Sequence, residues 1–331
     1  MPITIDDVAK MAGVSKATVS NVLTGKKFVN PDTVERINDA FRSLNFRPNA
    51  IAKSLRTKKT KTIGVILPLS WGDSHLTDII QGIRTVLQAE DYYLILGSTK
   101  DTQEDELYHI DRMYAHNVDG LIIIPNNSEN DYLAPTRGTG IPTVFMDRNV
   151  KGDYGDCVMS DNFRGAYEAV AALIERGHTK IGMITCTLKA TTILDRTRGY
   201  KGALDEAGLT VDESRILNIE PGQDEISAQL LRNIIGDREM TALFIAYGTY
   251  VESVLSYIKK NAIRIPQDLA IIAFDDFLRY TLMNPTLSAV KQPMFEIGVK
   301  AAQLILARIT NPDKPFETCY LSTKLILRDS I

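Results

Sequence analysis

The sequence predicts an all-α N-terminal domain followed by an α/β core of two Rossmann-like subdomains. Apolar residues recur at helical spacing over positions 1–47, and from position 62 onward short apolar strands alternate with amphipathic segments. The net charge also changes sign between these two regions. A chain of 331 residues, 44% of them hydrophobic, is long and apolar enough to build two or three domains.

The N-terminal region is basic, whereas the rest of the chain is acidic. Residues 1–61 contain 12 Lys and Arg against 5 Asp and Glu, a net charge of +7. The remainder has 26 basic (38 − 12) and 36 acidic (41 − 5) residues, a net charge of −10. This distribution indicates that only the N-terminal region meets a polyanion such as nucleic acid.

A first short helix is predicted from Asp6 to Ala12. Its apolar positions Val8, Met11 and Ala12 follow the i, i+3, i+4 pattern, and two acidic residues begin it at the positive end of the helix dipole. Gly13 can end this helix, because glycine readily adopts the left-handed conformation.

Two more helices are predicted to follow. Ser15 can cap a helix over residues 16–23, and Asn30 followed by Pro31 can begin a third helix. The apolar face of the third helix is formed by Val34, Ile37, Phe41 and Leu44. Helix, glycine turn and helix are typical of a DNA-binding helix-turn-helix, although the spacing alone also fits an ordinary helical hairpin. The basic charge favours the DNA-binding interpretation.

Residues 48–61 are predicted to form a hinge helix and linker. Pro48 can start a helix of about two turns, too short to be stable alone in water, so it would fold only against DNA. Leu55 lies between Lys and Arg residues, as the apolar wedges of minor-groove proteins do. Composition alone fits a flexible basic linker equally well.

At this point a family resemblance becomes specific. Residues 4–23 resemble the DNA-binding signature of the LacI family of bacterial transcriptional regulators, and residues 45–55 resemble its hinge helix. The resemblance implies a repressor that binds a palindromic double-stranded DNA operator as a homodimer. It assigns DNA-binding roles to seven residues: Lys16, Ala17 and Asn21 for bases, Thr18, Ser20 and Asn30 for phosphates, and Leu55 as the wedge.

The core is predicted to contain two α/β subdomains. Apolar strands are expected at 62–67, 92–96, 120–124, 143–146, 181–184, 242–245, 270–274 and 321–327, with helices at 76–89, 104–116, 163–176, 250–261 and 295–309. We assign about 62–160 plus 293–315 to the first subdomain and about 161–290 plus 316–331 to the second. The family resemblance makes this core periplasmic-binding-protein-like, with an effector in the cleft between subdomains.

Polar residues that follow strands are the candidate effector contacts, since ligands of open α/β sheets bind beyond the carboxyl ends of the strands. Arg196 matches the family's Arg-x-x-Gly-aromatic motif, Asp275 its Asp after an aromatic residue, and Asp147 the counterpart in the first subdomain. The full predicted effector-binding set is His75, Leu76, Asp147, Arg148, Arg196, Tyr247 and Asp275. Taken singly, each polar member could instead be a surface cap or an ion-pair partner.

The chain departs from the family pattern at Tyr247 and Gly248, where the family usually has Asn-Asp. The identity of the effector therefore cannot be inferred from that of a relative. Carboxylate and guanidinium groups favour a sugar, sugar acid or sugar phosphate over a purine. A phosphoprotein corepressor is a further alternative, as in the family's catabolite-control members. Trp71 could stack on a ligand or lie in the core or a dimer contact.

Several classes of protein are disfavoured. The sequence lacks a GxxxxGK[ST] loop, its single G-x-G at Gly138 precedes a strand, and its four His residues lack metal-ligand spacing. We therefore expect no metal, no cofactor and no enzyme activity, a sugar-phosphate enzyme being the remote alternative. Three scattered Cys residues, no signal peptide and no long apolar run indicate a cytoplasmic protein that does not bind membranes.

Overall fold

The computed structural model divides the chain into two compact units, Met1–Thr60 and Lys61–Ile331. It describes residues 3–24, 27–46, 59–68, 73–100, 102–126, 128, 140–150, 152, 155–187, 190–220, 226–236 and 240–331, without the side chains of residues 73 and 74. Leu55, Trp71, Gly138 and almost all of the predicted hinge helix and linker lie outside these described residues.

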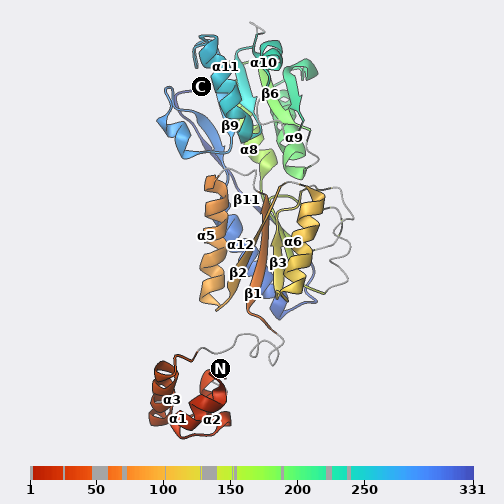
Figure 1. Ribbon diagram of the computed structural model, residues 1–331. Helices are drawn as coiled ribbons and strands as arrows, with labels where there is room; N and C mark the ends of the chain where they lie inside the picture. Colours follow the sequence, from red (N-terminus) through yellow and green to blue (C-terminus); the bar gives the residue numbers. More distant parts are fainter. Residues whose placement is uncertain are drawn as a thin grey trace. The chain divides into compact units, whose positions relative to one another are not determined.

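In residues 3–24 and 27–46 the first unit forms three helices, α1 (Ile5–Ala12), α2 (Lys16–Thr24) and α3 (Pro31–Ser43) (Figure 1). The predicted helix ends are confirmed. Gly13 closes α1 in the left-handed conformation with φ 64°, and the N–H of Thr18 donates to the Ser15 hydroxyl at the start of α2. Asn30 caps α3 by accepting from the N–H of Asp32.

The core of this unit lies between its three described helices, with Val8 of α1, Val19 of α2 and Ile37 of α3 fully buried. One sequence expectation was wrong here. Met11 is 55% exposed, whereas Ala9 is buried. The buried face of α1 therefore runs through residues 8, 9 and 12, because α3 packs against that side of the helix.

The described residues of the second unit form two six-stranded sheets (Figure 1). The first sheet has the order β11-β5-β4-β3-β1-β2. Its strands are β1 (Thr62–Pro68), β2 (Tyr93–Thr99), β3 (Gly120–Ile123), β4 (Thr143–Met146), β5 (Asp156–Ser160) and β11 (Thr318–Leu321). Helices α5 (Asp73–Ala89), α6 (Gln103–Ala115) and α12 (Met294–Thr310) pack against this sheet.

The second sheet has the order β12-β10-β9-β8-β6-β7. Its strands are β6 (Ile181–Cys186), β7 (Ile216–Ile219), β8 (Ala242–Ile245), β9 (Ala270–Phe274), β10 (Ser288–Lys291) and β12 (Lys324–Ile326). Helices α8 (Asn162–Ile174), α9 (Thr191–Glu206), α10 (Ala228–Ile235) and α11 (Val251–Lys260) accompany it, with short 3₁₀ turns at Glu213–Arg215, Gly248–Tyr250 and Leu278–Leu282.

The two sheets repeat one topology. In chain order, the strands of the second sheet occupy the same positions as those of the first, so that β4 corresponds to β9 and β5 to β10. All paired strands are parallel except β12, which runs antiparallel to β10. Strands with apolar residues buried on both faces are expected in such sheets, because helices cover them.

The C-terminal assignment of the predicted subdomains was wrong in one respect. The strand predicted at 321–327 corresponds to β12, which pairs with β10 in the second sheet, but a preceding strand that was not predicted, β11, pairs with β5 in the first sheet. Residues 316–331 therefore do not all belong to the second subdomain. The reason is that α12 packs on the first sheet, and the chain adds an edge strand there before it crosses over.

A buried ion pair fixes this C-terminal return. The guanidinium of Arg308, on α12, donates through Nε and Nη2 to the carboxylate of Asp156 at 3.1 and 2.7 Å. The same carboxylate accepts from the N–H of Glu317, just before β11. Since Arg308 and Asp156 are almost fully buried, either charge without the other would be strongly destabilising. No helix among the described residues is long and apolar enough to cross a membrane.

Candidate functional site

Two aspartates occupy equivalent positions in the two subdomains. Asp147 follows β4 and Asp275 follows β9, and both have a left-handed backbone, with φ of 62° and 74°. The N–H of Asp147 donates to the carbonyl of Val158 at 2.8 Å, and that of Asp275 to the carbonyl of Val290 at 3.0 Å. Non-glycine residues rarely adopt this conformation. Its occurrence at both equivalent positions therefore makes these two turns candidate parts of a functional site.

Arg196, on α9, lies beside the second aspartate. Its guanidinium is buried and donates from Nε to Oδ1 of Asn162 at 2.8 Å, and from Nη1 to the carbonyl of Ala246 at 2.9 Å. It also lies 3.7 Å from the centre of the Phe274 ring. Its Nη1 is 3.9 Å from Oδ2 of Asp275, so this ion pair is not a direct hydrogen bond. Neighbouring groups therefore hold the guanidinium in place.

Asp275 is positioned from two other sides. Nε2 of Gln292, which follows β10, donates to Oδ1 of Asp275 at 2.5 Å. A Cβ atom at Gly248 would lie 3.0 Å from Oδ2 of Asp275 and 3.1 Å from the carbonyl oxygen of Phe274. The glycine that departs from the family pattern thus lets the backbone after β8 approach this carboxylate closely.

Asp147 is paired with its neighbour Arg148. Nε of Arg148 is 3.7 Å from Oδ2 of Asp147, and both side chains are about 5% exposed. Nη1 of Arg148 donates to the carbonyls of Pro125 and Asn126, at 3.1 and 3.2 Å. As in the second subdomain, backbone carbonyls hold the guanidinium, and the carboxylate remains beyond hydrogen-bond distance from it.

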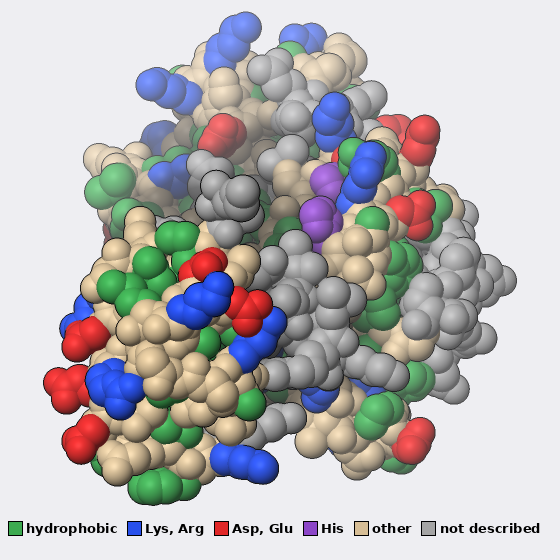
Figure 2. Space-filling model, turned by 60° about the horizontal axis from the view of Figure 1, so that its bottom comes forward, with side chains coloured by type: hydrophobic (Ala, Val, Ile, Leu, Met, Phe, Trp, Pro, Cys, Tyr) green, Lys and Arg blue, Asp and Glu red, His purple; other side chains and the backbone are tan. Residues whose placement is uncertain are grey.

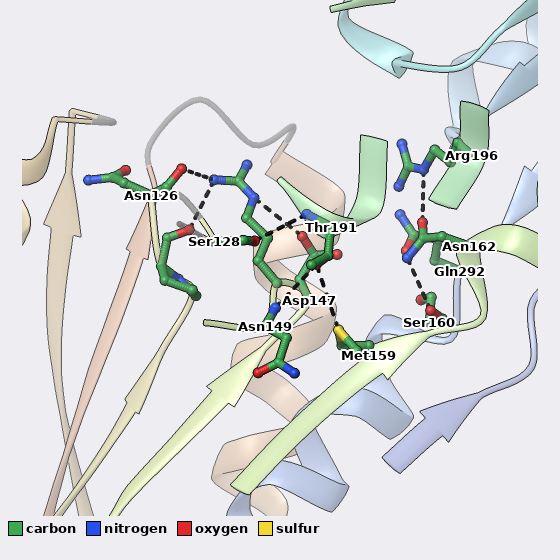
Figure 3. A network of polar contacts seen from close by, with 12 residues as sticks. Asn126, Ser128, Asp147, Asn149, Met159, Ser160, Asn162, Thr191, Arg196 and Gln292 are labelled. Atoms are coloured by element: carbon green, nitrogen blue, oxygen red, sulfur yellow. Dashed lines mark hydrogen bonds and ion pairs between the residues drawn. The ribbon is translucent and has the colours of Figure 1, made fainter. Parts of the chain in front are cut away.

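These residues form one group, which we call the polar cluster (Figure 3). It comprises Asn126, Asp147, Arg148, Ser160, Asn162, Arg196, Asp275 and Gln292. Within the part of the chain that the structure describes, five buried atoms of this cluster have no hydrogen-bond partner. They are Oδ1 of Asn126, Oδ1 of Asp147, Nε of Arg148, Oγ of Ser160 and Oε1 of Gln292. Buried polar atoms are normally paired, so this concentration of donors and acceptors is what a polar ligand would satisfy.

Burial determines the electrostatics of Asp147. Loss of hydration raises the pKa of its carboxyl group above the ordinary value of 3.8, and the charge of Asp275 acts in the same direction. Arg148, Arg196 and His75 oppose the rise in pKa. Because Asp275 and Arg196 lie in the other subdomain, the two halves of the polar cluster act on each other electrostatically.

Direct contacts also join the two subdomains. The ring of His75, on α5, stacks on that of Phe277, which follows β9, with centres 4.7 Å apart and an interplanar angle of 23°. The N–H of Thr191, at the start of α9, donates to the hydroxyl of Ser128 at 3.1 Å. The N–H of Asn149 in turn donates to the hydroxyl of Thr191 at 3.3 Å (Figure 3). The carboxyl ends of the two sheets therefore meet at the polar cluster.

The structure brings together Asp147, Arg148, Arg196 and Asp275, and places His75 at the contact between subdomains. Leu76 packs against the core of the first subdomain, and Tyr247 lies half-buried with its ring 5.4 Å from that of Tyr250. Effector contacts by these residues remain predictions. Sequence reasoning missed Asn126, Ser128, Ser160, Asn162, Thr191, Phe277 and Gln292.

In the first unit, the predicted base-reading residues lie on α2. Lys16 and Ala17 are exposed, and Asn21 is half-buried, as are Thr18 and Ser20. Residues 3–24 and 27–46 contain five basic and five acidic residues, so these two stretches together carry no net charge. The basic excess seen in the sequence therefore belongs to Lys26 and residues 47–61. Figure 2 shows both Lys and Arg side chains and Asp and Glu side chains on the face that it presents.

The raised pKa of Asp147 predicts how pH changes stability. A carboxyl group whose folded-state pKa is raised stabilises the fold below its ordinary pKa of 3.8, and this contribution is lost as pH rises through the folded-state value. Asp147→Asn should therefore gain stability relative to wild type as pH rises, by about 1.4 kcal/mol for each unit of pKa shift.

Urea denaturation between about pH 4 and pH 8 would measure this change. Asp268→Asn is a matched control, because the hydrogen bonds from Arg264 lower the pKa of Asp268 to about 2, and its titration lies below this pH range. A stability difference for Asp147→Asn that stays constant, or falls, with rising pH would contradict the burial argument.

Comparison with known proteins places both units in one family. Residues 4–49 match the family described as bacterial regulatory proteins, lacI family, and residues 170–331 match the periplasmic binding protein-like domain. The chain is 32% identical over 333 residues to the HTH-type transcriptional repressor PurR of Actinobacillus pleuropneumoniae, covering 99% of this chain and 98% of that protein. It is 31% identical, with the same coverage, to the ribose operon repressor of Haemophilus influenzae.

Solved structures show the same fold. The lac repressor dimer bound to operator and the anti-inducer ONPF has a TM-score of 0.85 at 22% identity, covering 100% of this chain and 99% of that one. A complex of the transcriptional regulator CelR with cellobiose has a TM-score of 0.74 at 24% identity, covering 99% and 100%. With both units matched and full-length relatives above 30% identity, the chain belongs to the LacI family of bacterial regulatory proteins.

Proposed function

We propose that this chain represses transcription by binding a palindromic operator as a homodimer, under the control of a small polar effector held by the polar cluster. The observation that supports the effector site is the set of unsatisfied buried atoms at the cluster, contributed by both subdomains. Membership of the LacI family supports the DNA-binding role of α2. A ligand that contacts both subdomains favours one relative arrangement of them, and so can change DNA affinity.

The chemistry of the polar cluster favours an oxygen-rich effector. A hydroxyl group both donates and accepts, so a polyol can donate to Oδ1 of Asp147 and accept from Nε of Arg148. The guanidinium groups add affinity for a carboxylate or phosphate substituent. We therefore propose a sugar, sugar acid or sugar phosphate. The LacI-family regulator of Enterococcus faecium, solved with bound ribose, shares 25% identity with this chain and has a TM-score of 0.69.

A purine is the second candidate, because several relatives near 32% identity carry the name PurR. A purine would need aromatic faces on which to stack. In this structure the rings of His75 and Phe277 already face each other at 4.7 Å. The unsatisfied donors and acceptors of the polar cluster are better matched by the hydroxyl groups of a sugar. A phosphoprotein corepressor remains the weaker alternative.

We further propose that the chain is not an enzyme and acts in the cytoplasm, where a bacterial repressor meets its operator. In the polar cluster each carboxylate faces a guanidinium group, which suits binding of a neutral or anionic ligand more than proton abstraction. Within the described residues, no three His, Cys, Asp or Glu side chains are grouped as a metal ion would require.

Selection from random DNA should yield an inverted repeat, because a two-fold dimer presents two copies of α2. Lys16→Ala and Asn21→Ala should each relax the preference at particular bases, by about 1–3 kcal/mol for a good bidentate contact. Lys59→Ala is the control for general electrostatics, since it should weaken all sequences alike. Absence of an enriched repeat with the wild-type protein would contradict the proposed repressor.

A thermal-shift screen of sugars, sugar acids, sugar phosphates and purines should identify the effector. At 100 times its Kd, a ligand stabilises the folded protein by about 2.7 kcal/mol. The shift should disappear in Arg196→Ala and in Asp275→Asn, which alter the polar cluster. Arg264→Ala removes an exposed guanidinium paired with Asp268, so it should leave the shift unchanged. A shift that survives both cluster variants would place the ligand elsewhere.

A further inference from the structure

The two acidic residues at the start of α1 have different partners. Asp7 completes a capping box, because its Oδ2 accepts from the N–H and hydroxyl of Thr4, at 2.9 and 2.7 Å. Asp6 takes no part in this cap. Its Oδ2 instead accepts from Nζ of Lys16, the first residue of α2, at 2.7 Å. A favourable position in the helix dipole thus explains the presence of Asp6 but not the direction of its side chain.

Stability does not account for this ion pair. The side chains of Lys16 and Asp6 are 63% and 53% exposed, and exposed ion pairs contribute about 0–1 kcal/mol. Compensation of a local positive charge does not account for it either, since residues 3–24 and 27–46 together carry no net charge. A carboxylate near DNA also repels phosphate. Its position beside a base-reading lysine therefore needs a different explanation.

The chemistry of base pairs in the DNA major groove explains the position of Asp6 beside Lys16. Residues at the N-terminus of a recognition helix reach base edges, and Lys16 is the first residue of α2. Lys donates to O6 and N7 of guanine, whereas Asp accepts from N4 of cytosine. These groups are neighbours on the major-groove edge of one G·C pair. An ammonium and a carboxylate 2.7 Å apart have the spacing to contact them together.

We propose that Asp6 is a specificity-determining residue, which acts with Lys16 to read a single G·C base pair in each half of the operator. The proposal rests on the proposed function of α2 in DNA binding. Lys16 donates to guanine and Asp6 accepts from the cytosine amino group. Asp6 also holds the ammonium of Lys16 away from phosphates, so that base contacts replace general attraction to DNA.

The test compares Asp6→Asn with Asp39→Asn by sequencing DNA selected from a random pool by the full-length protein. Asp39 is a matched control, because it is also an exposed carboxylate of this unit in an ion pair, with Arg42 at 2.6 Å. Asp6→Asn should reduce the preference for G·C at one position in each half-site by about tenfold, a loss within the range for one base contact. Asp39→Asn should leave all base preferences unchanged.

The Lys16→Ala variant adds a second requirement. If the two side chains read one base pair, Asp6→Asn should have little further effect at that position in the Lys16→Ala background. Both single Asn variants should raise the affinity for random DNA, since each removes one negative charge, and Asp6→Asn should raise it more, since it also frees the ammonium of Lys16 for phosphate contacts. Thermal melting would verify that each variant retains the fold of the first unit.

The outcomes separate this proposal from the function on which it rests. An enriched inverted repeat with wild type and unchanged base preferences in Asp6→Asn would overturn the role of Asp6 and leave the repressor intact. The same loss of preference in Asp39→Asn would also overturn it, by showing a general charge effect. No enriched repeat with wild type would instead contradict the proposed function itself.

Discussion

The polar cluster depends on one constraint, which is that charged groups buried between two subdomains must be compensated. Asp147, Arg148, Arg196 and Asp275 are each at most 8% exposed, and isolated charges in such surroundings would be very costly. The guanidinium groups compensate the carboxylate charges only in part, because they do not form direct hydrogen bonds with them. The carboxylate–guanidinium separations are 3.7 and 3.9 Å, while backbone carbonyls hold the guanidinium groups. Hydrogen-bonding capacity is thus retained for a ligand.

The repeated topology explains how one ligand can engage both halves. In each sheet an aspartate follows the third strand from the edge that the C-terminal segment forms. This strand is β4 in the first sheet and β9 in the second. Each subdomain has its own hydrophobic clusters on the two faces of its sheet. Between them lie mainly polar and aromatic contacts, such as Ser128 with Thr191 and His75 with Phe277. Interfaces of this kind permit relative motion of subdomains.

Much of this arrangement could be predicted from the sequence, because buried parallel strands are continuous apolar runs and the aspartates follow them directly. Asn162 and Gln292 could not, because they follow β5 and β10, which sequence patterns did not reveal. β5 reads Asp-Cys-Val-Met-Ser and β10 reads Ser-Ala-Val-Lys, so polar residues interrupt both apolar runs. Asp156 is tolerated inside a buried strand only because Arg308, 152 residues away, neutralises it.

The first unit shows a similar limit. Helix caps such as Gly13 and Asn30 are local signals, and the sequence predicted both. The charge of the region was assigned correctly in total, but not in position, because composition does not distinguish the helices from the segment that follows them. The partner of Asp6 is likewise a tertiary contact, formed only when α1 and α2 fold together.

Control of DNA binding from the polar cluster is the central claim, and reciprocal binding measurements test it most directly. The affinity for the operator would be measured with and without saturating effector, and the affinity for the effector with and without saturating operator. The account predicts that each ligand changes the affinity of the other by the same factor, about 5–150-fold. An effector that binds with equal affinity to the free and operator-bound protein would contradict it.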